Sequence, residues 1–280
     1  MISNEKPTLP ELLATALAKT FRDEEVGFTG LVTGNAAALF ATAIPVAAMQ
    51  LARLTHAPGL TILLAGWSHN PDLSQLDEIP DSEFDAVLRD LPCEAQQVDY
   101  PGQYSLKRGD VSFGFSSGAQ IDITGSLNSV CIGDYHRPKV RLVGPILQPE
   151  HMTLFGREYI MMPRHDARTF IEKVDYVSGV GYPGGLKGRR DLGLEKGGPE
   201  LVMTPKCVFE FDKIAGSMII RSIHPGVSAE ELRRSTGFDL GDLTNVALTD
   251  SPDREELRLL REVIDPKGLL LRGPGSETFV

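Results

Sequence analysis

The stretch LTILLAGWSHNP, residues 60–71, reads as a buried strand that runs into a polar turn. An earlier apolar strand is indicated at residues 26–34 (VGFTGLVTG). Residues 36–54 between them have a helical pattern, in which Pro45 marks a start or a kink. A strand, a helix and a strand within about 40 residues form a parallel crossover unit. This unit predicts an α/β fold, in which ligands bind at the carboxyl ends of the strands.

The rest of the chain fits an open, mostly parallel sheet with helices on both faces, followed by a hairpin and helices. The hairpin is predicted at residues 206–223, because FEF and MIIRSI flank the turn residues DKIAGS. Residues 72–103 are acidic and proline-rich, and we expect them to pass over the strand ends. No repeat or linker divides the sequence, so a single domain over residues 1–280 is expected. Further strands are predicted at 111–116, 140–143, 159–162 and 174–178, and further helices at 8–21, 84–91, 228–235 and 253–264.

The composition narrows the class of protein. A net charge of −10 and a pI near 5.1 argue against nucleic-acid or anionic-membrane binding, because both need clustered Lys and Arg. Three separate cysteines, Cys93, Cys131 and Cys207, favour buried thiols over disulfides or a zinc cluster. The amino terminus lacks a signal-peptide pattern, and no run approaches the roughly 18 apolar residues of a membrane span. We therefore expect a cytoplasmic protein.

Two catalytic motifs match in letters, but their surroundings do not fit. Residues 114–118 (GFSSG) match the G-x-S-x-G of a serine nucleophile, which needs a helix after the serine, whereas AQIDITGSLNS is poor helix sequence. Residues 179–184 (GVGYPG) match a dinucleotide fingerprint, whose helix must begin at the motif. A polar loop, expected to be mobile, follows instead. The six histidines show no paired helical spacing, so no metal site is predicted.

The most informative stretch is GAQIDITGSLNSVCIGDYHRPKVR, residues 118–141. Its glycines build turns that present polar groups to a cleft. Lys139 and Arg141 would add positive charge near an anionic ligand. The glycines and polar residues of this prediction are Gly118, Gly125, Gly133, Asn128, Asp134 and His136.

This stretch closely resembles the B (β) subunit of glutaconate CoA-transferase, a class I CoA-transferase. The shared pieces include GAQID at 118–122, G-x-x-N-S at 125–129 and, most specifically, IGDYHRPK at 132–139. The similarity spans roughly residues 12–268, nearly the whole chain. Further matches are IMM at 160–162, F-x-x-K-V-D-Y-V-S at 170–178, RRDLGL at 189–194, TGFDL at 236–240 and IDP at 264–266.

The resemblance implies a compact α/β subunit that pairs with an α-type subunit, often as a dimer of heterodimers. A CoA thioester would be the substrate, with no permanently bound cofactor. In such transferases a glutamate of the β subunit attacks the thioester, and an acyl anhydride and a glutamyl-CoA thioester follow. Backbone amides at glycine-rich turns would hold the oxyanion. The expected substrate and CoA pocket comprises Gly34, Asn35, Gly66, Trp67, Gly118, Ala119, Asn128, Asp134, His136 and Lys139.

The sequence departs from this family at the nucleophile. Ungapped matching places the family glutamate at Ala65, and a one-residue gap places it at Leu64, so neither position has a carboxylate. The nearest acids downstream are Asp72 and Asp77. A second departure follows Arg141, where the transferases have a Gly-Ser-Gly-Gly-Ala type loop. Residues 144–149 (GPILQP) replace those flexible glycines with rigid prolines and an apolar wall.

Three hypotheses follow. The first is a two-subunit enzyme on acyl-CoA thioesters whose catalytic carboxylate lies on the partner, as in an offshoot that hydrolyses ring-bearing CoA thioesters and also lacks the glutamate. Trp67 and the wall at residues 145–147 would suit a bulky substrate. The second is a true CoA-transferase with a displaced acid, Asp72 or Glu78. The third is a non-catalytic binding or regulatory subunit. Ser68 and His69 are weak candidates for proton transfer, the alternative being simple turn polarity.

Overall fold

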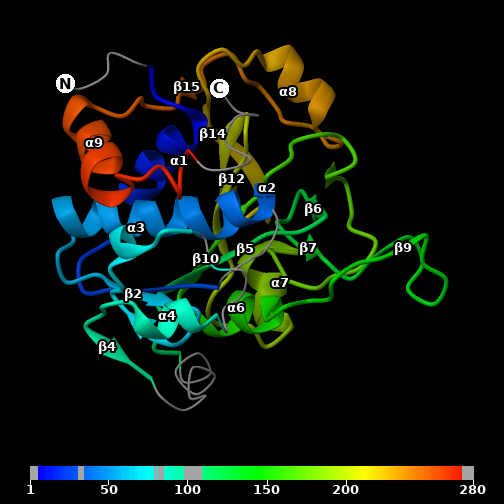
Figure 1. The fold of residues 1–280 in the computed structure, drawn as a ribbon. Helices are drawn as coiled ribbons and strands as arrows, with labels where there is room; N and C mark the ends of the chain where they lie inside the picture. Colours follow the sequence, from blue (N-terminus) through cyan, green and yellow to red (C-terminus); the bar gives the residue numbers. More distant parts are fainter. Residues whose placement is uncertain (1–5, 31–34, 79, 81–84, 98–108, 273–280) are drawn as a thin grey trace. The chain divides into compact units, whose positions relative to one another are not determined.

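The computed structural model describes residues 6–30, 35–78, 80, 85–97 and 109–272 of the chain. Its contacts divide into two compact units: unit 1 comprises residues 1–115 and 250–280, and unit 2 comprises residues 116–249. Each unit combines helices with strands (Figure 1), which confirms the predicted α/β class. The expectation of a single domain over residues 1–280 stays a prediction.

Helix α1 (Leu9–Ala18) opens unit 1 where the capping pattern predicts it. The Glu11 amide donates to Thr8 Oγ1 over 3.4 Å, and the Thr8 amide donates to Glu11 Oε2 over 2.8 Å. Leu13 and Leu17 are fully buried one turn apart. The apolar stripe of the sequence therefore packs into the core of unit 1, where α1 contacts α3 (Ile44–Thr55).

The predicted crossover unit is present. Strands β1 (Val26–Thr29) and β2 (Thr61–Leu64) pair in parallel, with Thr29 opposite Leu64. The connecting helix runs through α2 (Asn35–Ala38), the π-helical η1 (Leu39–Ala43) and α3. Pro45 lies in the first turn of α3, directly after the π-helical turn. Because proline lacks an amide hydrogen, this wider turn accommodates the missing helical hydrogen bond, and Pro45 marks a start as expected.

One helical stretch, Ala36–Thr55, passes the length and composition test for a membrane span, although the sequence predicted none. Gln50 and Arg53 interrupt its apolar residues, so no unbroken apolar run is visible in the sequence. In the structure 72% of its most apolar 18-residue window is buried. Such burial is typical of the core helix of a folded domain, which passes the same test.

The strands of unit 1 follow the order β5-β1-β2-β3-β4. The bounds of the other three are β5 (Phe113–Ser116), β3 (Ser68–His69) and β4 (Ala95–Gln96). β5 and β2 flank β1 in parallel, whereas β3 and β4 add antiparallel strands. The carboxyl ends of three parallel strands therefore share one edge. Unit 1 also contains η2 (Leu73–Gln75), α4 (Ala86–Asp90), α9 (Arg254–Arg258) and the π-helical η3 (Leu259–Ile264).

Unit 2 combines sheets, a short hairpin and helices. Its strands are β6 (Gln120–Asp122), β7 (Leu127–Asn128), β8 (Cys131–Ile132), β9 (Val140–Arg141), β10 (Arg157–Met161), β11 (Phe170–Ile171), β12 (Pro199–Met203), β13 (Cys207–Asp212), β14 (Ser217–Ile223) and β15 (Ala247–Leu248). Its helices are α6 (Gln148–Leu154), α7 (Gly185–Asp191) and α8 (Ala229–Ser235).

The larger sheet of unit 2 is mixed. Its order is β10-β12-β13-β14-β15, with parallel pairs at both ends and the predicted hairpin, β13 and β14, in the middle. Strands β11-β6-β7 form a smaller sheet, and β8 pairs with β9. Large apolar side chains such as Met152, Phe170 and Phe209 form the core of unit 2.

Two sequence predictions for unit 2 are wrong. Residues 174–178 form no strand. Side-chain hydrogen bonds hold that segment instead, since Asp175 Oδ2 accepts from Gln120 Nε2 and from the Gly133 amide, each over 2.9 Å. The expected mobile loop after Gly184 contains helix α7, and Arg189 within it is only 2% exposed. Neighbouring arginines look equally polar in a sequence, so only packing identifies the buried one.

Candidate functional site

The carboxyl end of β2 turns back on itself within two residues. Ala65 and Gly66 have φ angles of 54° and 73°, and the Trp67 amide donates to the Leu64 carbonyl over 3.0 Å. Left-handed backbone at both central residues matches the tight turn of a β-hairpin. Gly66 adopts this conformation freely, whereas the Cβ of Ala65 opposes it at a cost of about 1 kcal/mol or more. Ala65, where the sequence resemblance predicts the family glutamate to fall, is therefore a strained strand end.

Ser68 and His69 follow this turn on β3, with Ser68 opposite Leu64 and His69 opposite Leu63. Successive side chains of a strand point to opposite faces, so the two cannot act together on one reacting atom. Ser68 is 2% exposed, and His69 is half-buried. His69 Nδ1 has no hydrogen-bond partner among the described residues. Each of them stays a separate prediction for proton transfer.

The acids downstream of the turn are already engaged or exposed. Asp72 caps η2, where its Oδ1 accepts from the Ser74 amide (3.2 Å) and hydroxyl (2.6 Å). A hydrogen bond from Lys267 Nζ, 2.8 Å long, lowers the pKa of Asp77. Glu78 is exposed. Of the other predicted pocket residues, Gly34 lies outside the described residues, and only the backbone of Asn35 is described, at the start of α2.

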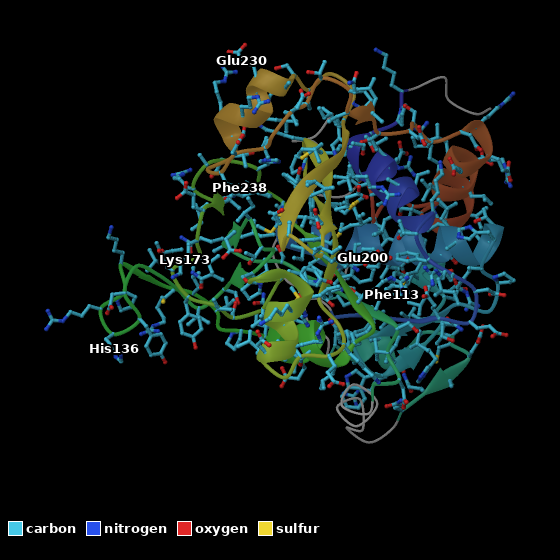
Figure 2. The ribbon with its side chains drawn as sticks, turned by 180° about the vertical axis from the view of Figure 1, so that it is seen from behind. Phe113, His136, Lys173, Glu200, Glu230 and Phe238 are labelled. Carbon is cyan, nitrogen blue, oxygen red and sulfur yellow. The ribbon has the colours of Figure 1, made fainter. Side chains whose placement is uncertain are left out.

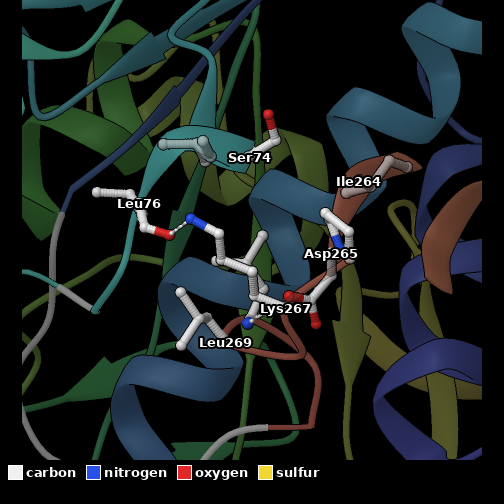
Figure 3. Close-up of a pocket in the computed structure, with 9 residues that line it drawn as sticks. Ser74, Leu76, Ile264, Asp265, Lys267 and Leu269 are labelled. Carbon is white, nitrogen blue, oxygen red and sulfur yellow. Dashed lines mark hydrogen bonds between the residues drawn. The ribbon is translucent and has the colours of Figure 1, made fainter. Parts of the chain in front are cut away.

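A narrow cleft of about 10 Å³ lies between η2 and the segment after η3, with Lys267 reaching across it (Figure 3). Lys267 Nζ donates to the Leu76 carbonyl over 2.9 Å. The Asp265 carboxylate accepts from the amides of Leu270 (3.1 Å) and Leu271 (2.9 Å). Both charged groups thus hold backbone in place, and the cleft is too small for an acyl-CoA. We do not place the site here.

In unit 2 the predicted pocket residues fall into a buried and an exposed group. Asn128 is fully buried: its Nδ2 donates to Gln120 Oε1 and to the Cys131 carbonyl, each over 2.7 Å. Its Oδ1 accepts from the Val130 and Cys131 amides at 3.0 and 3.3 Å. The Ala119 amide donates to the Asn128 carbonyl over 2.8 Å, and a Cβ at Gly118 would lie 3.2 Å from that same oxygen. The donor and acceptor atoms of the Asn128 side chain are therefore already used in hydrogen bonds that hold the turn.

Asp134, His136 and Lys139 are exposed on the β8–β9 hairpin, and Ala119 is exposed as well. Figure 2 shows His136 standing out from the body of unit 2. Asp134 Oδ1 accepts from the His136 and Arg137 amides at 2.9 and 3.0 Å, which closes the hairpin loop. These contacts hold the hairpin itself and do not extend to Asn128, so the three side chains stay predictions for ligand binding.

The loop that precedes α6 keeps a glycine-like backbone despite its prolines. Gly144, Ile146 and Leu147 have φ angles of 104°, 42° and 57°. Left-handed backbone is uncommon for any residue with a side chain and is a marked outlier for β-branched isoleucine. The Ser129 hydroxyl donates to the Gly144 carbonyl over 2.7 Å, which helps to hold the loop. Ile146 is 65% exposed, so the expected apolar wall faces outward from unit 2.

A buried polar cluster consists of Ser116 at the end of β5, His151 on α6 and Glu158 on β10. These residues are 5%, 5% and 0% exposed. The Ser116 hydroxyl donates a short hydrogen bond to Glu158 Oε1. His151 Nδ1 lies 3.1 Å from that oxygen and 3.4 Å from Ser116 Oγ. Among the described residues, Glu158 Oε2 has no hydrogen-bond partner.

The sequence identified this cluster only in part. It marked Ser116 as the centre of G-x-S-x-G, but residues 117–126 contain no helix, so the context of a serine nucleophile is missing. His151 was only a loop-flanking histidine, and no motif marks Glu158. Ser116 meets His151 and Glu158 only through tertiary packing, because it lies 35 and 42 residues from them in sequence.

The other motif has a structural explanation, and of the three thiols predicted to be buried, Cys131 and Cys207 are buried whereas Cys93 is partly exposed. A Cβ at Gly181 would lie 2.1 Å from the Thr124 carbonyl, so this glycine allows close backbone packing rather than dinucleotide binding. A helix does begin at Gly185, but no strand precedes the motif in residues 174–178. Burial raises the pKa of the Cys207 thiol to about 12. Among the described residues, no group of three or more His, Cys, Asp or Glu side chains could hold a metal ion.

Comparison with known proteins identifies one family. The family described as Coenzyme A transferase matches residues 103–235. The chain is 32% identical over 273 residues to the B subunit of glutaconate CoA-transferase from Acidaminococcus fermentans, covering 95% of this chain and 96% of that protein. It is 30% identical over 251 residues to the B subunit of 3-oxoadipate CoA-transferase from Pseudomonas knackmussii, covering 90% and 91%.

A shorter similarity reaches a hydrolase subunit. The chain is 31% identical over 157 residues to the cholesterol ring-cleaving hydrolase IpdB subunit of Rhodococcus jostii, covering 54% of this chain and 58% of that protein. The crystal structure of glutaconate coenzyme A-transferase from Acidaminococcus fermentans matches with a TM-score of 0.77 and 29% identity, covering 96% of this chain and 98% of that chain. The crystal structure of Rhodococcus jostii IpdAB matches with a TM-score of 0.74 and 26% identity, covering 96% and 99%.

Proposed function

The chain belongs to the coenzyme A transferase family, and from that premise we propose that it is the β-type subunit of a two-subunit enzyme acting on acyl-CoA thioesters. An α-type subunit is the proposed partner, in a heterodimer or a dimer of heterodimers. Relatives named as B subunits align over at least nine-tenths of this chain, which supports the assignment. The CoA thioester is the substrate, and no permanently bound cofactor is invoked.

The turn at the end of β2 carries the mechanistic part of the proposal. The backbone there is held sharply, with Ala65 at a φ of 54°, but the side chain offers no oxygen to attack a thioester. The family's covalent route through a glutamate of this subunit is therefore closed at its usual position. We place the catalytic carboxylate on the α-type partner and propose hydrolysis rather than CoA transfer as the outcome.

The loop at residues 144–147 supports a substrate bulkier than a small dicarboxylate. Its outward side chains, with Ile146 65% exposed, give an apolar surface, and Trp67 adds an aromatic face in unit 1. The shared similarity to a subunit named as a ring-cleaving hydrolase agrees with such a substrate. The left-handed residues of the loop also give it a turn from which backbone amides can stabilise an oxyanion.

The remaining substrate contacts are proposed by unit. Lys139 and Arg141, exposed on the β8–β9 hairpin, would attract the phosphates of coenzyme A. The Asn128 bonds would keep the neighbouring turn in shape for the same substrate. The full proposed set is Gly34, Asn35, Gly66 and Trp67 in unit 1, and Gly118, Ala119, Asn128, Asp134, His136 and Lys139 in unit 2.

The other two hypotheses gain no support from the structure. A true CoA-transferase would need a displaced acid, but Asp72 is occupied as a helix cap and Glu78 is exposed after that turn. A purely regulatory subunit would have no need of the strained backbone at Ala65 and Ile146, because such strain is commonly kept where a site requires it.

The test is co-expression with an α-type subunit, followed by incubation of the pair with acyl-CoAs and labelled acetate. Free CoA without label in the thioester pool would support hydrolysis, whereas label entering that pool would support transfer. Hydroxylamine or borohydride trapping of a CoA adduct on this chain would contradict the view that it lacks the nucleophile. A fully active preparation of this chain alone would contradict the two-subunit proposal.

Restoring the carboxylate is a direct test of the strand end. Ala65→Glu should let the pair exchange label from acetate into the thioester pool, at a rate at least about tenfold above that of the unmodified pair. Ala36→Glu, on the exposed start of α2, is the matched control and should leave exchange unchanged. If Ala65→Glu brings no exchange, the loop at residues 144–147 is the block instead.

A further inference from the structure

The β8–β9 hairpin, residues 131–141, is a two-stranded ribbon that extends away from the body of unit 2. Among the described residues, β8 and β9 pair with each other and with no further strand. Figures 1 and 2 both show its loop standing clear of the rest of unit 2, with His136 in that loop. A two-stranded ribbon is marginally stable in water unless something packs against it. What its two faces present to solvent therefore indicates what it can bind.

Contacts within unit 2 fix the shape of the β8–β9 hairpin before anything binds to it. The Lys139 amide donates to the Ile132 carbonyl over 2.9 Å. The Arg141 guanidinium donates to the Tyr135 carbonyl over 3.2 Å and lies 5.1 Å from the centre of the Tyr135 ring. That ring stacks on Tyr176, with 5.2 Å between the ring centres. A surface held in this way loses little conformational entropy on binding, which favours affinity.

One face of the hairpin is apolar. Ile132 and Val140 lie opposite each other in the strand pair, so their side chains share a face, whereas Arg141 points to the other face. Val140 is 48% exposed, and Ile132 is half-buried. Val143, just beyond β9, is 79% exposed. Single exposed apolar residues are normal, but an apolar cross-strand pair on a ribbon with no third strand is typical of a surface that packs against another chain.

The charge of the hairpin indicates the kind of partner. Residues 131–141 contain three cations, Arg137, Lys139 and Arg141, and one acid, Asp134, so they carry a net charge of +2 on a chain of −10. Arg137 and Lys139 are exposed. Two copies of a chain with this overall charge repel each other, which disfavours a second copy as the occupant. A different subunit, with a groove that is apolar and carries acidic side chains, complements the hairpin.

We propose that the β8–β9 hairpin inserts into such a groove on the α-type subunit. The inference rests on the proposed function, which supplies that partner. Ile132 and Val140 pack on the apolar floor of the groove, and Arg137 pairs with an acid of the partner. Arg141, on the opposite face, stays available to the phosphates of coenzyme A. A stable interface buries roughly 800 Å² on each partner, so the hairpin provides one part of the interface and other surfaces complete it.

The experiment is sedimentation of the co-expressed and purified two-subunit complex over a dilution series, which gives the Kd between the subunits. Val140→Asp should raise that Kd by about 100-fold or more, because a carboxylate would be buried against an apolar floor. Val140→Thr keeps the β-branched shape and should raise the Kd by about tenfold. Ile214→Asp on the turn between β13 and β14 is the matched control, since Ile214 is 87% exposed, and its Kd should stay within about twofold of the wild-type value.

Two further readouts test the occupant itself. The photoreactive variant His136→p-benzoylphenylalanine should crosslink to the α-type subunit in the complex. Arg137→Glu should raise the Kd by about tenfold and make it less sensitive to salt, because an ion pair across the interface is lost. A crosslink to a second copy of this chain, no crosslink at all, or an unchanged Kd in Arg137→Glu would contradict the inference.

The inference and the proposed function fail in different ways. A complex whose Kd is the same in Val140→Asp as in Ile214→Asp would contradict the inference and leave the two-subunit enzyme in place. Failure of the wild-type chain to form any complex with an α-type subunit, or a complex that turns over no acyl-CoA, would contradict the proposed function. Thermal unfolding of each complex shows whether a variant has lost its fold, and in that case Val140→Thr supplies the comparison.

Discussion

Arg189 is a buried cation that lies over the Tyr182 ring and whose hydrogen bonds, among the described residues, all go to backbone carbonyls. Its Nη1 donates to the carbonyls of Val180 and Gly181, each over 2.8 Å. Its Nη2 donates to the carbonyls of Met152 (2.8 Å) and Lys196 (2.9 Å). Burial lowers the pKa of Arg189, because water no longer solvates the charge. One side chain therefore ties the loop before α7, the end of α6 and the segment before β12 together.

Arg189→Met should lower the free energy of unfolding by roughly 3 to 5 kcal/mol, because methionine fills part of the space but leaves four carbonyls, those of Met152 and Gly181 buried, without the Arg189 donor. Arg190→Met next to it is the matched control, since Arg190 is exposed, and it should change stability by about 0.5 kcal/mol at most. Urea unfolding of both variants gives the comparison. Equal losses of stability in the two variants would show that the hydrogen bonds from Arg189 to the four carbonyls contribute nothing to the free energy of unfolding.

The strain at Ala65 makes a stability prediction of the opposite sign. Ala65→Gly should raise the free energy of unfolding by about 0.5 to 1 kcal/mol, because glycine adopts a φ of 54° without a Cβ clash but has a more flexible unfolded chain. Ala52→Gly, buried within α3, should instead lose about 1 kcal/mol or more. Urea midpoints of the two variants check the signs. A loss at Ala65 would mean that its turn is not strained.

Among the elements, α1 near the start of the chain is held by η3 near its end. Arg261 Nε donates to Glu11 Oε1 over 2.6 Å, and its Nη2 donates to Glu11 Oε2 over 2.8 Å. Glu11 also accepts from the Thr8 amide, as the capping box of α1. With Glu11 1% exposed, this paired contact is shielded from solvent and couples the two ends of unit 1.

Glu11→Gln should cost about 2 to 3 kcal/mol, because the amide removes the charge and can accept through only one oxygen, so Arg261 loses half of a bidentate bond. The matched variant is Glu255→Gln at the start of α9, where an exposed glutamate pairs with Arg258 and solvent screens the pair, so a much smaller loss is expected. Thermal unfolding of both checks the difference. Similar losses would show that burial of the pair does not strengthen it.

At the scale of the whole molecule, stability should depend on pH through two buried histidines of unit 2. His165 bridges the hydroxyls of Thr204 (2.9 Å) and Thr236 (3.1 Å). His224 lies between the Thr249 hydroxyl (2.8 Å) and the Thr204 carbonyl (2.9 Å). Burial lowers the pKa of His165 to about 3 and that of His224 to about 4. Both histidines are therefore neutral in the folded protein at pH 5.

As the pH falls below about 6.5, the unfolded chain binds protons on these histidines and the folded chain does not. The stability present above that pH is lost progressively toward pH 4, by about 2 kcal/mol per histidine at pH 5. Urea unfolding at pH 7.5 and pH 5 measures the loss. The double variant His165→Gln, His224→Gln should show a smaller fall between the two pH values, whereas exposed His136→Gln should keep the wild-type fall. An equal fall in all three would assign the effect to other groups.

Local sequence determined the elements whose signals are local. The crossover from β1 to β2, the capping box at Thr8 and the hairpin of β13 and β14 each depend on residues that are close in the chain, so spacing and turn chemistry were enough. The family resemblance added the likeness to a β-type subunit, which the comparisons confirm. It also gave the placement of the family glutamate at Ala65 or Leu64, which stays a prediction.

Only the tertiary structure decided which polar residues became buried and which backbone became strained. Ser116, His151 and Glu158 meet through packing inside unit 2, and no local pattern encodes that meeting. Isoleucine disfavours the left-handed backbone that Ile146 adopts. Contacts from elsewhere in the chain, such as the hydrogen bond from Ser129 to the Gly144 carbonyl, must therefore hold it. The free energy of a polar side chain depends on whether it is buried and on which residues it contacts. The tertiary structure sets both, whereas the sequence gives only the residue type.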